Sequence, residues 1–161
     1  MPKLSAGVLL YRVRDGIVEV LLAHPGGPFW ARKDEGVWSV PKGEYLDGED
    51  PWTAARREFA EEIGLSMPTG TRVDLGRARQ PGGKVVSVFA VHGDLDVTAA
   101  RSNTFELEWP KGSGTLLRVP EVDRVGWFPP ARARDKLIEG QRVFLDRLLA
   151  LPELVGLREG T

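Results

Sequence analysis

Two apolar, β-branched runs open the chain. They cover residues 4–13 and 17–24, and Arg14-Asp15-Gly16 separates them. Because glycine can supply the positive φ that a tight turn needs, we predict a pair of neighbouring strands. The same pattern predicts strands at 73–80 and 84–91, on either side of a Pro-Gly-Gly turn, and a last strand at 122–128.

A Gly/Pro-rich stretch over residues 25–36 interrupts this pattern. It is followed by Trp-Ser-Val at 38–40, which we predict to be a short strand, and by the segment 41–50. Long irregular connections inside a small domain are usually functional or mobile. We therefore expect this part of the chain to be either functional or mobile.

The clearest helix prediction covers residues 51–63. Asp50 can cap it, Pro51 suits the first helical position, and Gly64 can end it in a left-handed conformation. A second helical region is expected from about 130 to 150, where Val143, Phe144, Leu148 and Leu151 recur at helical spacing. The polar stretch 93–120 carries no pattern that assigns an element.

Strands before, between and after helices indicate a mixed α/β layered fold. A length of 161 residues is sufficient for one domain with its own core, so we expect residues 1–161 to form a single domain with one active site. The first apolar run is broken by Arg12 and Arg14, and no apolar stretch approaches the length of a membrane span. We expect no membrane partner.

Charge and composition narrow the function further. The chain has 22 basic and 23 acidic residues, so it has no broad positive field to hold long nucleic acid. Small anionic ligands remain possible. The absence of cysteine removes disulfides, thiolate nucleophiles and zinc sites built on sulfur. This composition favours a cytoplasmic protein, and the oligomeric state stays open.

Three glutamates share one side of the predicted helix. At 100° per residue, Glu58, Glu61 and Glu62 fall within about a third of the circumference, beside a separate apolar stripe. Like charges at this spacing cost a helix a few tenths of a kcal/mol per pair unless a cation lies among them. Magnesium prefers carboxylate oxygens, so the alternatives are a magnesium site and a solvated helix face.

The spacing around these glutamates decides between the alternatives. From Gly43 to Leu65 the chain matches the pattern G-x5-E-x7-R-E-U-x-E-E-x-G-U in full, with U apolar and Phe59 bulkier than usual at the first U. A chance match has a probability on the order of 10⁻⁹ per starting position. The chain resembles the Nudix hydrolase family over 43–65, and more loosely from about 4 to 130.

The resemblance implies an α/β/α sandwich with a mixed sheet and a divalent metal, Mg²⁺ with Mn²⁺ as a possible substitute. It also implies roles for individual residues. Metal ligands would be Glu58, Glu61, Glu62 and a backbone carbonyl at Lys42 or Gly43. Arg57 and Glu49 would form an ion pair that orients Glu58, and Gly43 and Gly64 would shape the backbone around the helix.

The implied reaction is attack of water on a diphosphate, for which a carboxylate must collect a proton. Glu58 is one candidate. Some Nudix enzymes use a glutamate from a later loop as base or additional metal ligand, and Glu121, six residues before Trp127, has that placement. Glu106 and Glu108 are rivals, and Glu121 could also be an ordinary loop carboxylate.

Other residues could select the substrate. Lys42 precedes the glutamate motif directly and could contact a phosphate. Phe29 and Trp30 could stack on a base or anchor their loop on the core, and Trp109 has the same two interpretations. His24 and His92 show no metal-binding spacing, and we expect both to be structural.

The nature of the substrate stays open among several nucleotides. The opening SAGVLLYR, the PKGE entry and Glu121 look like diadenosine polyphosphate hydrolases. Pro81, sixteen positions past Leu65, looks like a marker of ADP-ribose pyrophosphatases, while Gly82 and Gly83 stand where some dinucleoside polyphosphate enzymes have a tyrosine. We favour dinucleoside polyphosphates. The alternatives are ADP-ribose, a nucleoside triphosphate, 5′-capped or triphosphate RNA, and a non-catalytic nucleotide sensor.

Overall fold

The computed structural model describes residues 3–157 of the chain. Its helices are α1 (Pro51–Ile63), α2 (Pro130–Lys136) and α3 (Arg142–Leu149), with short 3-10 turns η1 (Val97–Ala99) and η2 (Glu139–Gln141). Its strands are β1 (Leu4–Arg14), β2 (Ile17–Pro25), β3 (Lys42–Tyr45), β4 (Arg72–Arg79), β5 (Val85–His92), β6 (Thr104–Glu108), β7 (Leu116–Pro120) and β8 (Val122–Phe128). None of the helices within residues 3–157 is long and apolar enough to cross a membrane.

The main sheet is mixed, as the family resemblance implies. Its strand order is β4-β5-β1-β2-β8, and β3 pairs with the first residues of β1. Strand β1 is parallel to β5 and antiparallel to β2 and β3. Core residues pack on both faces of β1, so residues 5–11 are all buried, which explains why apolar side chains predominate there.

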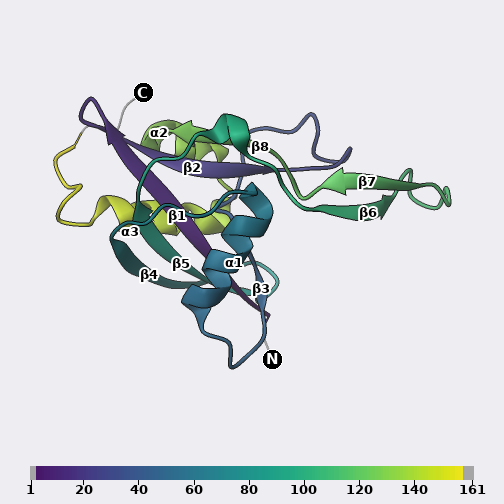
Figure 1. Cartoon of the computed structure of the whole chain (residues 1–161), viewed down its shortest axis with the longest axis horizontal. Coiled ribbons are helices and arrows are strands. Elements are labelled where there is room, and N and C mark those ends of the chain that lie inside the picture. The colour runs from purple at the N-terminus through teal and green to yellow at the C-terminus, as the bar shows by residue number, and fades with distance from the viewer. Residues whose placement is uncertain (1–2, 158–161) are drawn as a thin grey trace.

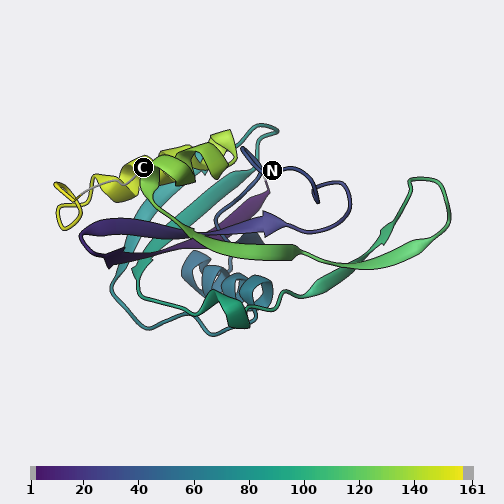
Figure 2. The same cartoon turned by 90° about the horizontal axis from the view of Figure 1, so that it is seen from above.

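Helices cover both faces of this sheet, so the expected three-layer sandwich is confirmed (Figures 1 and 2). Alternating β1 residues point to opposite layers. Ala6, Val8 and Leu10 pack with Phe59 and Ile63 of α1. On the other face, Leu9 and Tyr11 pack with residues of α2 and α3, namely Ala133, Phe144, Leu145 and Leu148.

The strand predicted at 38–40 is wrong. Trp38 and Ser39 make only isolated bridges, to Leu137 and Ala23 respectively, and the strand that pairs with β1 is β3 at 42–45. Pro41 separates the two segments and lacks a backbone N–H to continue a ladder. Gly7 permits the close approach that follows, because a Cβ there would lie 2.5 Å from the carbonyl oxygen of Pro41.

The unassigned stretch 93–120 contains a hairpin. Strands β6 and β7 form a separate two-stranded sheet that projects from the body of the molecule (Figures 1 and 2). Phe105 is opposite Val119, and Leu107 is opposite Leu117. These four side chains therefore share one apolar face of the hairpin.

Candidate active site

Helix α1 orients the glutamate motif. The Asp50 carboxylate caps it by accepting from the backbone N–H of Thr53 at 3.1 Å, and Gly64 ends it with φ of 75°. Phe59 and Ile63 are fully buried against the sheet. The apolar stripe therefore fixes the rotation of the helix, and Glu58 and Glu62 face the segment around β3.

Glu58 lies against the backbone of Gly43. A Cβ at position 43 would overlap the Glu58 carboxylate, so the absence of a side chain makes room for that group. The guanidinium of Arg57 forms an ion pair with Glu49, and its Nη2 lies 3.5 Å from Glu58 Oε1. The Arg57–Glu49 pair implied by the resemblance is thus present beside Glu58.

Glu62 lies deeper, next to Lys42. Its Oε1 accepts a 3.2 Å hydrogen bond from the backbone N–H of Lys42. Burial raises the pKa of Glu62 to about 8, although the Lys42 charge acts in the opposite direction, and the charges of Glu121 and Glu58 raise it further. Burial also lowers the pKa of the Lys42 ammonium. The Glu62 carboxylate therefore lies in a buried environment in which its ionisation is unfavourable unless a further cation is nearby.

Glu58 is under a similar constraint. Burial raises its pKa, and the charge of Glu61 raises it further, while Arg57 acts in the opposite direction. Glu61 itself is exposed. Glu58 and Glu62 are therefore two desolvated carboxylates whose negative charges a nearby cation would stabilise.

The donor set fits magnesium. Within residues 3–157, no group of three or more acidic or histidine side chains is arranged so that it could hold a metal ion. Mg²⁺ does not need three protein ligands, because it keeps several waters and is usually bound through one or two carboxylates together with substrate phosphates. Glu58 and Glu62 supply hard oxygen donors of that kind beside the Lys42-Gly43 backbone.

Backbone hydrogen bonds bring Glu121 to the same place. The N–H of Asn103 donates to the Glu61 carbonyl at 2.9 Å, and the N–H of Glu121 donates to the Asn103 carbonyl at 3.0 Å. The Glu121 carbonyl in turn accepts from Gly26 at 3.0 Å. Because its charge also raises the pKa of both Glu58 and Glu62, Glu121 faces the glutamate cluster.

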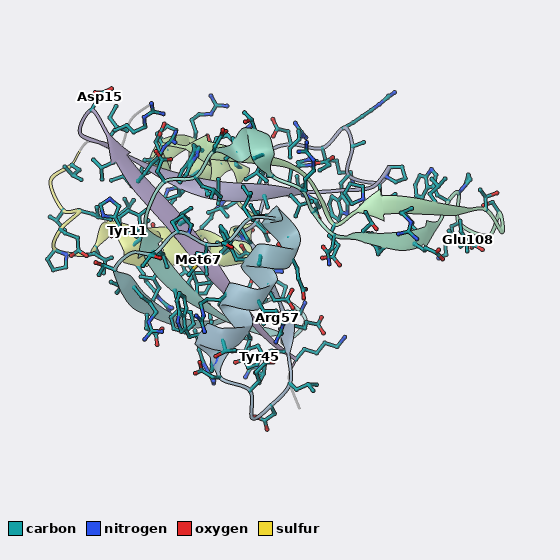
Figure 3. The ribbon with its side chains drawn as sticks, in the orientation of Figure 1. Tyr11, Asp15, Tyr45, Arg57, Met67 and Glu108 are labelled. Atoms are coloured by element: carbon teal, nitrogen blue, oxygen red, sulfur yellow. The ribbon has the colours of Figure 1, made fainter. Side chains whose placement is uncertain are left out.

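The rival carboxylates lie on the projecting hairpin. Glu108 is near its outer end, far from α1 and Arg57 in Figure 3, and its Oε1 accepts from the N–H of Gly112 at 2.7 Å. Glu106 is exposed and lies opposite Arg118. Trp109 follows Glu108 at the same end of the hairpin. The geometry therefore favours Glu121 over Glu106 and Glu108 as the additional carboxylate.

A cleft of about 640 Å³ opens beside these carboxylates. Lys42, Glu62 and Glu121 form its polar side. Its apolar side comes from several segments, with side chains of Trp30, Val37, Phe105, Val122 and Ile138. A polar end next to an apolar wall suits a ligand that carries both phosphate and a flat base.

The two aromatic residues predicted in the loop differ in position. Trp30 lines the cleft. Phe29 is 53% exposed and packs edge-on against Trp30, with ring centroids 4.7 Å apart. Phe105 also lines the cleft and was not among the residues predicted from the sequence. Its alternation with Glu106 and Leu107, before a Pro-Lys-Gly-Ser-Gly turn, was the signal that could have indicated a strand.

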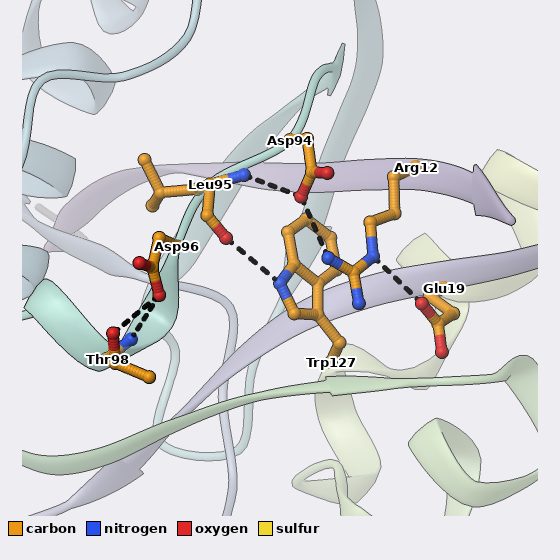
Figure 4. Close-up of polar contacts among 7 residues, drawn as sticks. All are labelled: Arg12, Glu19, Asp94, Leu95, Asp96, Thr98 and Trp127. Carbon is orange, nitrogen blue, oxygen red and sulfur yellow. Dashed lines mark hydrogen bonds and ion pairs between the residues drawn. The ribbon is translucent and has the colours of Figure 1, made fainter.

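Trp127 belongs to a second polar cluster, shown in Figure 4. Its indole N–H donates to the Leu95 carbonyl at 3.3 Å, and the Arg12 guanidinium lies 4.1 Å from its ring centroid. Arg12 also bonds Glu19 and Asp94, each at 2.8 Å. These contacts attach the segment after β5 to the sheet, so Trp127 has a structural role.

The two histidines also have structural partners. His24 is fully buried between Asp123 and the Lys33 carbonyl. His92 stacks on Tyr11 with ring centroids 4.9 Å apart. Each histidine is therefore held by residues of neighbouring segments of the fold.

Comparison with known proteins supports the expected family. The NUDIX domain family model matches residues 1–148. An RNA pyrophosphohydrolase of Rhodospirillum rubrum is 46% identical over 65 residues, which are 39% of this chain and 38% of that protein. The asymmetrical bis(5′-nucleosyl)-tetraphosphatase of Caenorhabditis elegans is 37% identical over 62 residues, 38% of this chain and 41% of that protein. The chain thus spans about two fifths of the length of these two curated relatives.

Solved structures resemble the whole fold. A binary complex of Caenorhabditis elegans Ap4A hydrolase has a TM-score of 0.60 and 22% identity, and the match covers 92% of this chain and 96% of that chain. The NUDIX domain of Shewanella oneidensis NrtR, complexed with ADP ribose, has a TM-score of 0.58 and 18% identity, over 92% and 86% of the two chains. Identities this low establish the fold alone. Together with the family match over residues 1–148, they show that the chain belongs to the Nudix family.

Proposed function

We propose that this protein is a metal-dependent hydrolase that splits a diphosphate linkage in a small nucleotide. The observation that carries the proposal is the placement of two desolvated carboxylates, Glu58 and Glu62, beside Lys42 and at one end of a cleft with an aromatic wall. Such a site accepts a cation and a phosphate at one end and a base at the other.

Glu58, Glu61 and Glu62 would hold the metal, with a backbone carbonyl at Lys42 or Gly43 as a further donor. Mg²⁺ suits these oxygens, and Mn²⁺ could replace it. When bound, the metal would neutralise phosphate charge and lower the pKa of a coordinated water.

The chain's own residues would supply the remaining functions. Arg57, paired with Glu49, would hold the Glu58 carboxylate in one orientation. The Lys42 ammonium would bind a phosphate oxygen as a point charge. Glu121 or Glu58 would accept the proton of the attacking water, since burial and neighbouring charge make Glu58 a stronger base than an ordinary carboxylate.

Dinucleoside polyphosphates are the substrates that we favour. A named tetraphosphatase and an Ap4A hydrolase structure, both from Caenorhabditis elegans, are among the similar proteins. Trp30 and Phe105 give the cleft two aromatic side chains for a base. ADP-ribose stays an alternative because the similar NrtR domain is complexed with it, and because the position of Pro81 resembles that in ADP-ribose pyrophosphatases.

RNA with a 5′-triphosphate is a second alternative, since two similar proteins are named RNA pyrophosphohydrolase. A net charge of −1 offers no extended basic path for a polynucleotide, so we rank RNA below the small nucleotides. A non-catalytic nucleotide sensor is the alternative from another class. Retention of every glutamate in the motif argues against it.

A substrate panel tests these choices. The purified protein would be assayed with Mg²⁺ or Mn²⁺ against diadenosine polyphosphates, ADP-ribose, NADH, nucleoside triphosphates and 5′-triphosphate RNA, with products identified. We expect the highest kcat/KM on a diadenosine polyphosphate and complete inhibition by chelator. Tight binding without product would support the sensor, and preference for RNA would replace the favoured substrate. A folded Glu62→Gln variant that kept full turnover would refute the metal assignment.

A further inference from the structure

Lys136 is a buried cation at the end of α2. It is the last residue of that helix, and only 7% of its side chain is exposed. Lysine is almost never fully buried unless its charge is paired. Its ammonium meets two carboxylates, with Nζ 2.7 Å from Asp34 Oδ2 and 2.9 Å from Glu35 Oε1. Both acidic residues belong to loop 26–37, so the charge of Lys136 is directed at this loop.

Asp34 has a second partner at the end of the loop. Its Oδ2 binds Lys136, and its Oδ1 accepts from the indole N–H of Trp38 at 2.7 Å. Trp38 is buried and packs edge-on against Phe128, with ring centroids 5.0 Å apart. The hydrogen bond between Lys136 and Asp34 raises the pKa of the ammonium and lowers the pKa of the carboxyl, so both groups are charged at neutral pH. The ion pair thus connects α2 to the loop and to a core side chain.

Backbone hydrogen bonds continue this attachment. The N–H of Gly36 donates to the Asp135 carbonyl at 2.9 Å, and the N–H of Trp38 donates to the Lys136 carbonyl at 3.0 Å. The Trp38 carbonyl accepts from the N–H of Ile138 at 2.9 Å. The chain on both sides of Lys136 therefore lies beside the end of the loop.

The attached residues form part of the apolar wall of the cleft. Gly36, Val37 and Ile138 all line it. Gly36 and Val37 directly follow the two carboxylates that bind Lys136, and Ile138 lies two residues beyond that lysine. Because its ammonium is occupied by the two carboxylates, Lys136 acts on the cleft through its neighbours and not by contact with a ligand.

A second ion pair of α2 lacks this connection. Arg134 Nη1 lies 2.7 Å from Asp146 Oδ1 of α3, and both side chains are exposed. This pair joins two helices and involves no residue of loop 26–37. Exposed pairs of this kind contribute little to stability. Arg134 is therefore a matched control for Lys136, since it carries the same charge on the same helix.

We propose that Lys136 is a positioning residue whose ion pairs with two loop carboxylates hold loop 26–37 against α2, and so place the apolar wall on which a nucleotide base binds. The glutamates that would bind the metal lie on α1, so this wall concerns the base end of the ligand. The part of the proposal that concerns the base rests on the proposed function, whereas the attachment of the loop does not.

Hydrogen exchange tests the attachment without any substrate. In Lys136→Met the amides of Gly36 and Trp38, which donate to carbonyls of α2, should exchange about tenfold faster than in the natural protein, because two charged hydrogen bonds beside them are lost. Lys136→Arg keeps the charge, and Arg134→Met leaves the loop untouched, so both should exchange like the natural protein. Unchanged exchange in a folded Lys136→Met protein would refute the attachment.

If Lys136→Met fails to fold, Asp34→Asn decides the question. The new amide oxygen can still accept from the Trp38 indole, and Glu35 still pairs with Lys136, so the loop loses one ion pair while the packing around it is kept. The same two amides should exchange several-fold faster in this variant. Exchange as slow as in the natural protein would refute the attachment here too.

Two inhibitors separate the base end of the cleft from the metal end. ADP carries a base, whereas inorganic tripolyphosphate does not. With diadenosine tetraphosphate and Mg²⁺, we expect Lys136→Met to raise KM and the inhibition constant of ADP by about tenfold, with kcat and the inhibition constant of tripolyphosphate within about twofold of the natural values. Lys136→Arg and Arg134→Met should match the natural protein in all four quantities.

The outcomes of the inhibition experiment are distinct. Equal weakening of ADP and tripolyphosphate in Lys136→Met, or a loss that Lys136→Arg fails to restore, would overturn the positioning role. Absence of turnover and of ADP binding in the natural protein would instead refute the proposed function, and the role toward a base with it. The exchange comparison would still decide whether Lys136 attaches the loop, because it needs no substrate.

Discussion

The Glu58 carboxylate occupies the space that a side chain at Gly43 would fill. Gly43 belongs to β3 and pairs with Ala6, so its backbone follows an ordinary strand. Glycine is therefore needed at this position because a side chain would not fit beside Glu58, and the backbone conformation does not require it. It links the first residue of the glutamate motif to the glutamate that lies fifteen residues later.

Replacing Gly43 with alanine should displace Glu58 without unfolding the protein. A misplacement of about 1 Å in a catalytic site can cost on the order of a hundredfold in rate, and we expect kcat to fall by about that factor. Steady-state kinetics would measure the loss, and circular dichroism would verify the fold. Full turnover in a folded Gly43→Ala protein would show that the position of Glu58 is unimportant.

Variants at Glu121 and Glu108 form a matched pair that tests which carboxylate accepts the proton. Glu121→Gln should lower kcat by about 10² to 10⁴, the usual contribution of a general base, with a smaller effect on KM. Glu108→Gln should leave kcat unchanged, because Glu108 bonds Gly112 in the outer part of the hairpin. If Glu121→Gln retained its kcat, Glu58 would remain as the acceptor.

Substitution of Ser102 would test whether its hydrogen bonds position Glu121. Its hydroxyl accepts from the N–H of Val122 at 3.0 Å and donates to the Asn103 carbonyl at 2.8 Å, which also accepts from Glu121. Ser102→Ala should reduce kcat several-fold, since losing such a hydrogen bond costs about 1 kcal/mol, and Ser102→Thr should restore it. A reduction that threonine fails to restore would point to a general loss of packing instead.

Local sequence signals predicted the helix and the glutamates well. The limits of α1 coincide with the predicted 51–63, because Asp50, Pro51 and Gly64 act through the backbone of the helix itself. Glu58 and Glu62 follow from the same helix, since residues at this spacing share a face. These features depend on neighbours along the chain and could be read from it.

Features that depend on distant partners were not predictable in the same way. Residues 38–40 have strand-like composition, yet the strand forms at 42–45, where Gly7 lets the chain approach β1. Within residues 3–157, the β6–β7 hairpin forms a sheet only with itself, so its strands lack the long buried stretch of β1. Phe105 went unnoticed for that reason, because only the folded hairpin brings it to the cleft.

The raised pKa of Glu62 predicts how stability changes with pH. The folded protein keeps the Glu62 proton up to a pKa of about 8, whereas the unfolded chain loses it near the model-compound value of 4.5. Between these values the folded state binds more protons, so without metal its stability should fall as pH rises through this window. Thermal unfolding followed from pH 5 to pH 8 would measure a decrease of several degrees, at about 2–4 °C per kcal/mol.

Glu62→Gln is the control for this pH effect. It carries no ionisable group at position 62, so its unfolding temperature should fall less over the same range and exceed that of the natural protein at the upper end. Added Mg²⁺ should stabilise the natural protein more at pH 8 than at pH 5, because the ligand must be deprotonated. Identical pH profiles for the two proteins would contradict the assignment of the raised pKa to Glu62.

The hairpin offers a test of the cleft's apolar wall. Phe105 lines the cleft, whereas Leu116, 62% exposed, belongs to the opposite face of the same hairpin. If Phe105 stacks on a base, Phe105→Ala should raise KM by about tenfold with little change in kcat, since such stacking contributes about 1–3 kcal/mol. Phe105→Tyr should retain the natural KM, and Leu116→Ala should leave both constants unchanged. Both alanine variants remove an exposed apolar side chain, so equal effects on KM would mean that each substitution acts by destabilising the hairpin. A rise in KM confined to Phe105→Ala would assign that face of the hairpin to substrate binding.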